Sequence, residues 1–100
     1  MAEQIDYAMM QELSGTSVFA DADDGNRVEL RILEVVRIME SQAAILPRIP
    51  FSVFFLGPDS FMLPQGTYAM RHQSFTEPHP IFIVPITQRP DGFLYEAVFT

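Results

Sequence analysis

The chain has 100 residues, of which 48% are hydrophobic, and this is the size and composition of one soluble globular domain. Its formal net charge is −7, and six scattered Arg without any Lys exclude the clustered cations by which proteins bind nucleic acid or an anionic membrane. The absence of Cys excludes disulfides, thiolate catalysis and Cys-ligated zinc.

The sequence also predicts where the protein acts. Residues 1–6 are acidic and lack the cationic and apolar regions of a secretory signal. No apolar run approaches the roughly 20 residues that a membrane helix needs. We therefore expect a cytoplasmic protein with no membrane partner. Only 19% of the residues are charged, which suggests that a partner covers part of the surface.

One short helix is expected at the start of the chain. Ile5, Met9 and Leu13 recur at every fourth position, which predicts an amphipathic helix over residues 4–13 that Ser14 and Gly15 end. A helix of this length is not stable in isolation, so it must pack on its own sheet or on another subunit. We expect it to pack on its own sheet, as a lid over one open end of the core.

Six apolar or alternating runs, separated by Gly and Pro, predict consecutive antiparallel strands. Asp24-Gly25 predicts a hairpin turn, and a phase slip at Ile32-Leu33 predicts a β-bulge or a bend. Pro85 cannot donate to a ladder, so we expect it at an edge or a bulge. The predicted strands are 16–20, 27–38, 51–56, 65–72, 81–86 and 93–99. The predicted fold is all-β: a six-stranded antiparallel sandwich or small barrel with one short N-terminal helix, forming a single β domain over residues 1–100 with its sheet core in 16–99.

The sequence makes further predictions for the connection at 39–50 and for the strand that follows it. Residues 39–50 are predicted to be a loop, in which 43–46 form a turn of helix. The strand at 51–56 is apolar on both faces apart from Ser52, which predicts a strand in the middle of a sandwich or under the helix.

The segment Leu63-Pro-Gln-Gly-Thr-Tyr68 is the most specific motif of the chain. Pro64 is expected to fix the backbone there, and Gly66 to supply a conformation or a close approach that only glycine allows. Tyr68 is expected to bury its ring and to use its hydroxyl in a hydrogen bond. The alternative is that this loop is presented to a partner.

The second half of the chain resembles a family of small, uncharacterised bacterial domains that share a Leu-Pro-Gln-Gly-Thr-Tyr segment and the ending Tyr95-Glu-Ala-Val-Phe99. The resemblance implies a compact β domain and assigns no catalytic residue to this chain. It also implies an accessory or assembly role in a phage-tail-like particle, because members are often encoded beside phage-tail-collar-like proteins. The positions that carry the structural motif are Pro64, Gly66, Tyr68, Pro85, Gly92 and Tyr95.

Candidate ligands for a metal ion are few. Asp21, Asp23 and Asp24 suggest a calcium loop, but the fifth and twelfth positions of that loop are Gly25 and Ile32, so a solvated hairpin turn is favoured.

The only two histidines are a second candidate. His72, His79 and Glu77 could form a two-His-one-carboxylate site, but the favoured interpretation places His72 at a strand end and His79 in a Pro-flanked turn. We therefore expect neither a metal nor another cofactor.

Catalytic motifs are not evident. The chain has no Gly-x-Ser-x-Gly elbow and no Gly-rich phosphate loop. Glu96 is the one acid among apolar neighbours of the last strand: facing inward it would have a raised pKa, and facing outward, which is favoured, it is the polar residue of an alternating strand. Arg71 is a candidate salt partner for it.

Two functional hypotheses follow. The favoured one is a non-enzymatic interaction or assembly domain that binds a protein partner or self-associates, supported by low charge, nine Phe, six Met and a possible sheet edge at Pro85. It predicts an apolar patch around Met9 and Met10. The alternative is a small ligand-binding barrel or enzyme with a concave site that has His72, His79 or Glu96 at its mouth.

Overall fold

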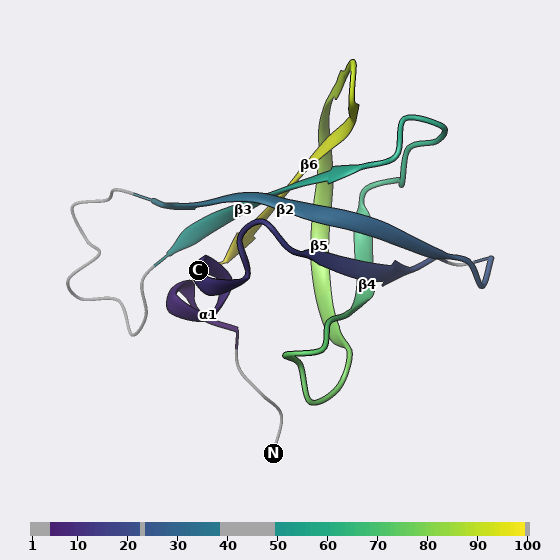
Figure 1. Cartoon of the computed structure of the whole chain (residues 1–100). Coiled ribbons are helices and arrows are strands. Elements are labelled where there is room, and N and C mark those ends of the chain that lie inside the picture. Colours follow the sequence, from purple (N-terminus) through teal and green to yellow (C-terminus); the bar gives the residue numbers. More distant parts are fainter. Residues whose placement is uncertain (1–4, 23, 39–49, 100) are drawn as a thin grey trace.

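The computed structural model describes residues 5–22, 24–38 and 50–99, and Figure 1 shows how they are arranged. The predicted helical turn at 43–46, and most of the loop around it, lie outside the described residues. Within the described ranges the elements are α1 (Tyr7–Leu13), β1 (Ser17–Asp21), β2 (Arg27–Arg37), β3 (Phe51–Gly57), β4 (Gly66–Arg71), β5 (His79–Arg89) and β6 (Gly92–Phe99).

The six strands close into a barrel in the order β1-β2-β3-β6-β5-β4, with antiparallel neighbours throughout. The pairing of β1 with β4, from Phe19 opposite Arg71 to Asp21 opposite Ala69, closes it. The predicted all-β fold is therefore confirmed, and of the two predicted architectures the chain adopts the barrel.

The predicted irregularity in the second strand is a β-bulge. The register of β2 against β3 shifts between Ile32 and Glu34, so Leu33 is the extra residue. Before the bulge residues 27–31 of β2 pair with β1, and from Arg31 to Arg37 the strand pairs with β3. A bulge bends and twists its strand, which here lets β2 extend past the barrel wall.

Pro85 also lies beside a bulge, because the register of β5 against β6 shifts between Pro85 and Thr87. The strand is longer than the predicted 81–86, and it includes Pro80 opposite Ala69 of β4. Pairing with β4 ends at Ile83, and from Val84 onward β5 pairs with β6. At Pro85 β5 therefore has a strand partner on one side only, next to the bulge, which is where a residue without an N–H donor is expected.

Side chains fill the barrel interior. Inward positions alternate with outward ones along each strand, as in other small barrels. The largest fully buried side chains are those of Met10, Val18, Leu30, Ile32, Phe51, Val53, Phe55, Met70, Ile81, Ile83 and Tyr95.

Helix α1 covers one end of the barrel, as predicted. The Tyr7 ring meets the Phe51 ring edge-on at 5.9 Å between centroids, and Phe51 stacks on Phe99 at 4.8 Å. These contacts place α1 where β3 begins and β6 ends (Figure 1).

The limits and buried face of this helix differ from the prediction. Asp6 caps it by accepting a hydrogen bond from the Met9 N–H at 2.9 Å, so the helix begins at Tyr7. Its buried residues are Met10 and Leu13, whereas Met9 is only half-buried. The apolar patch expected around Met9 and Met10 is therefore absent, because Met10 lies in the core.

Candidate interaction surface

His72 joins the β4–β5 connection to the end of α1. Its Nδ1 accepts a hydrogen bond from the Ser74 N–H at 2.9 Å, and its Nε2 lies 3.0 Å from Thr16 Oγ1. The Thr16 hydroxyl donates to the Leu13 carbonyl at 2.7 Å, so it is the acceptor of the hydrogen bond from His72 Nε2–H. A hollow of about 390 Å³ adjoins His72, but both ring nitrogens are already used within the chain, which indicates a structural role.

His79 is buried at the start of β5, rather than in the turn that the sequence suggested. Its ring meets the edge of Phe75 at 5.0 Å between centroids, and the ring of His72 lies 5.5 Å from the same Phe75. Among the described residues no three His, Asp or Glu side chains lie close enough together to bind a metal ion. This includes the candidate group of His72, His79 and Glu77.

Glu96 lies far from both histidines. Its cross-strand partner is Val84 of β5. Val84 lies five residues after His79 in the same strand, a distance of about 16 Å at the usual rise per residue. Its neighbours Tyr95 and Ala97 point into the core, so Glu96 faces outward, as favoured. The structure therefore does not bring Glu96 together with the two histidines in one site.

The expected ion pair between Glu96 and Arg71 is wrong, because β5 separates β4 from β6. Glu96 instead accepts a hydrogen bond from the Ser52 hydroxyl at 2.9 Å. Arg71 pairs with Asp21 at 2.9 Å, and Arg27 lies 3.1 Å from the other oxygen of the same carboxylate. The hydrogen bond from Arg71 is the main cause that holds the pKa of Asp21 below its usual value, and the hydrogen bond from Arg27 adds to it.

Asp24 belongs to the hairpin turn rather than to a cation site. Its carboxylate accepts from the Asn26 backbone N–H at 3.0 Å and from the Asn26 side chain at 2.9 Å, and these hydrogen bonds lower its pKa. Gly25, at φ +88°, completes the turn that Asp24-Gly25 predicted.

The residues of the shared motif hold the β3–β4 connection on the barrel. The Tyr68 ring is buried and its hydroxyl donates to the Pro64 carbonyl at 2.6 Å. The Leu63 N–H donates to the Tyr95 hydroxyl at 2.8 Å, and burial raises the pKa of that phenol.

Of the two motif glycines, only Gly92 is required by its surroundings. The expectation for Gly66 is wrong, since a side chain there would meet nothing nearer than a Tyr68 ring atom at 3.9 Å. Gly92 has φ +146°, and a Cβ on it would lie 2.0 Å from the Gly57 carbonyl oxygen.

The outer surface of β2, β3, β6 and β5 carries an apolar patch that we call the outer apolar face. Three of its side chains are the most exposed: Val98 (55%), Phe82 (50%) and Val36 (42%). The register of β2, β3, β6 and β5 places its other members side by side, and Phe82 lies two positions before Val84 on the same side of β5. The outer apolar face comprises Val36, Phe54, Leu56, Phe82, Val84, Leu94 and Val98, with Ser52 and Glu96 among them.

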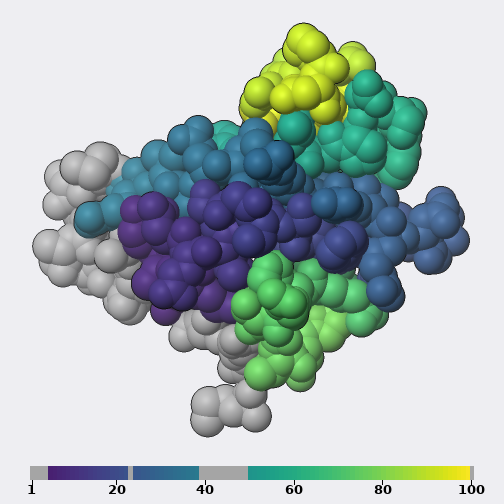
Figure 2. Space-filling view, viewed as in Figure 1, coloured from purple at the N-terminus to yellow at the C-terminus, as the bar shows by residue number. Residues whose placement is uncertain are grey.

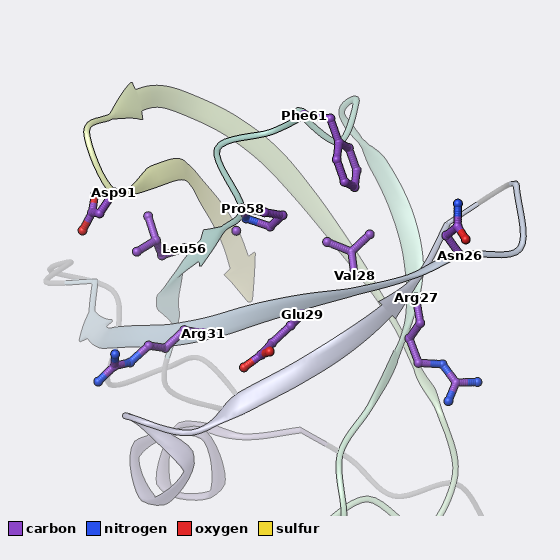
Figure 3. A pocket seen from close by; sticks show the side chains of 10 residues that line it. Asn26, Arg27, Val28, Glu29, Arg31, Leu56, Pro58, Phe61 and Asp91 are labelled. Carbon is purple, nitrogen blue, oxygen red and sulfur yellow. The ribbon is translucent and has the colours of Figure 1, made fainter.

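A groove of about 520 Å³ adjoins this face at the barrel end opposite α1. In Figure 2 it opens between the teal and yellow lobe, formed by the β3–β4 connection and the β5–β6 turn, and the blue strand β2. Figure 3 shows Val28 and Phe61 pointing toward each other across it, and Arg27 pointing away. Leu56 and Arg31 line the groove as well, and Leu56 also belongs to the outer apolar face.

Sequence reasoning missed this surface, although one signal for it was present. The strand at 51–56 is apolar on both faces, a pattern that predicts burial on both sides. In the barrel the second face of β3 lies outside, where Phe54 and Leu56 are only half-buried. Phe82 and Val98 are also exposed, at outward positions of β5 and β6. Finding that these residues and β3 form one surface requires the order of the strands.

Among the described residues no helix has the length and apolar character needed to span a membrane. No curated protein and no solved structure is similar enough to the chain to count as a match. The sequence pattern of a family described as a domain of unknown function (DUF6916) matches residues 5–99. The chain therefore belongs to this DUF6916 family.

Proposed function

We propose that this protein is a non-enzymatic interaction or assembly domain that acts in the cytoplasm as an accessory part of a phage-tail-like particle. The observation that carries the proposal is the outer apolar face, whose Val98, Phe82 and Val36 side chains are each more than 40% exposed. Contiguous apolar patches on a soluble domain are typical of binding surfaces. The tail-like context rests on the sequence resemblance and on its implied gene neighbours.

The arrangement of polar side chains supports an interaction domain over an enzyme. Both ring nitrogens of His72 are used in hydrogen bonds, one to Ser74 within the β4–β5 connection and one to Thr16 beside the end of α1. Glu96 faces outward, about 16 Å along the sheet from His79, so these groups do not converge on a common point. Acid–base catalysis needs its groups within hydrogen-bond reach of one substrate.

Affinity capture from the native lysate tests this function. The tagged wild-type domain is compared with a Phe82→Ser, Val98→Ser double variant, and the bound proteins are identified by mass spectrometry and sized by light scattering. The matched control is Phe19→Ser, since Phe19 is 40% exposed but lies on β1, outside the outer apolar face.

We expect a stoichiometric protein partner with the wild-type domain and with Phe19→Ser, and at least tenfold less of it with the double variant. Recovery of structural proteins of a tail-like particle would support the proposed context. A wild-type domain that elutes alone, or a partner that binds the double variant equally well, would overturn the proposal.

A further inference from the structure

The outer apolar face has a carboxylate near its centre. Glu96 is flanked across the sheet by Phe54 and Val84, and along β6 by Leu94 and Val98. It is partly exposed, and within the described residues its hydrogen-bond donor is the Ser52 hydroxyl rather than a cation. A partner that covers this face must also remove water from the carboxylate.

Desolvating a carboxylate is costly unless the partner supplies a compensating group. The Ser52 hydroxyl, itself buried, satisfies one oxygen of Glu96 and holds the side chain against the sheet. The remaining acceptor positions face outward. A guanidinium or ammonium group satisfies them best, because hydrogen bonds between oppositely charged groups are about twice as strong as neutral ones.

A second copy of the chain is a poor occupant of this face. Two-fold packing centred on the face brings the two Glu96 carboxylates together, and like charges at close range repel each other. Each copy also has a formal net charge of −7, which opposes association in general. Arg31, an exposed cation at the border of the face, lies on β2 opposite Leu56, two strands away from Glu96.

We propose that the outer apolar face binds a different protein, whose contact surface is apolar and presents one Arg or Lys side chain to Glu96. This inference rests on the proposed function and specifies the chemistry of the partner. Apolar side chains around Glu96 supply the contact area, and the ion pair fixes the orientation of the partner and excludes uncharged competitors.

The first test uses two small probes of similar shape, one cationic and one neutral. 2-Phenylethylguanidinium combines an aromatic ring with a cation, and 2-phenylethylurea is its neutral counterpart of similar shape. Each is titrated into ¹⁵N-labelled protein, and amide shifts are followed by NMR for the wild-type domain, Glu96→Gln and the control Glu34→Gln. Glu34 lies in the same cross-strand row, on β2, so it reports on a carboxylate at the edge of the face.

We expect the guanidinium probe to shift the amides around Phe54, Glu96 and Val98 and to bind about tenfold more tightly than the urea. Glu96→Gln should abolish that preference, and Glu34→Gln should retain it. Equal binding of the two probes, the absence of shifts at these amides, or a preference that survives Glu96→Gln would overturn the inference.

The second test separates this inference from the proposed function. Affinity capture is repeated with Glu96→Gln, and the dissociation constant of the captured protein is measured for each variant. We expect at least tenfold weaker binding by Glu96→Gln and less than threefold by Glu34→Gln. Capture that is unaffected by Glu96→Gln, or a wild-type homodimer in analytical ultracentrifugation, would overturn the charged partner while leaving an interaction domain in place. Failure to capture any protein would overturn the proposed function itself.

Discussion

The inner and outer faces of β3 and β6 are both apolar, yet only the inner one is buried. Val53, Phe55, Tyr95 and Ala97 point inward and are at most 1% exposed. On the other side of the same two strands, Val98 is 55% exposed, and Phe54, Leu56 and Leu94 are half-buried. The inner face is sufficient to fill the barrel, so the apolar residues outside are not required by the core.

Truncating one residue on each face gives the strongest test of this comparison. Phe55→Ala leaves a cavity in a filled core and should lower the free energy of unfolding by about 3–5 kcal/mol. Phe54→Ala removes a ring of the same size from the outer face, where solvent can fill the space, and should cost less than half as much. Urea denaturation followed by circular dichroism measures both, and equal losses would contradict the distinction between the faces.

Gly92→Ala tests how β6 is joined to the barrel. An alanine Cβ would lie 2.0 Å from the Gly57 carbonyl oxygen, and the backbone has φ +146°, so we expect a loss of about 3 kcal/mol. Gly25→Ala is the matched control, because φ there is +88° but the space around it is open. That variant should lose about 1 kcal/mol in the same urea titration. A Gly92→Ala loss no larger than that of Gly25→Ala would show that the close approach is not restrictive.

Local patterns were sufficient to predict most of the fold. The Asp24-Gly25 turn, the bulge at Leu33 and the irregularity at Pro85 each follow from a few neighbouring residues and their backbone requirements. Closure into a barrel did not follow, because it depends on pairing between β1 and β4, about 50 residues apart. The helix was shifted for a local reason, since the cap at Asp6 determines which residues face the core.

The candidate surface was less predictable than the fold. Alternation along β6 correctly placed Glu96 outside, opposite to Tyr95 and Ala97. Its partner could not be found, because the order of strands decides whether Ser52 or Arg71 is its neighbour. The outer apolar face could not be predicted for the same reason, since its residues become neighbours only through the order of the strands.

Tyr95→Phe probes the one polar group that the inner face of β6 buries. The change leaves the Leu63 N–H without its acceptor at a buried position, so we expect a loss of about 2 kcal/mol at pH 7. Tyr68→Phe is the control, with an expected loss of about 1 kcal/mol, because its hydroxyl donates to Pro64 at a partly exposed position. A loss from Tyr95→Phe no greater than from the control would contradict the assigned role.

Tyr95→Phe should also change how the stability of the domain depends on pH. Burial raises the pKa of Tyr95 above the ordinary value of 10.0. Above pH 10 the unfolded chain therefore loses this proton while the folded chain keeps it, and stability falls as the pH rises. The contribution is fully present below pH 10. Thermal melting between pH 8 and 11 should show a shallower alkaline decline for Tyr95→Phe than for the wild type, and identical slopes would contradict this assignment.

Val98→Ser should have the smallest effect on stability, less than about 0.5 kcal/mol in the urea titration, because the side chain is more than half exposed. The inward neighbour Ala97, at 1% exposure, provides the contrast: Ala97→Ser places a hydroxyl in the core and should cost about 1–3 kcal/mol. If Val98→Ser destabilised the fold as much as Ala97→Ser, the outer apolar face would be part of the core of the isolated domain. Its residues would then no longer argue for a partner.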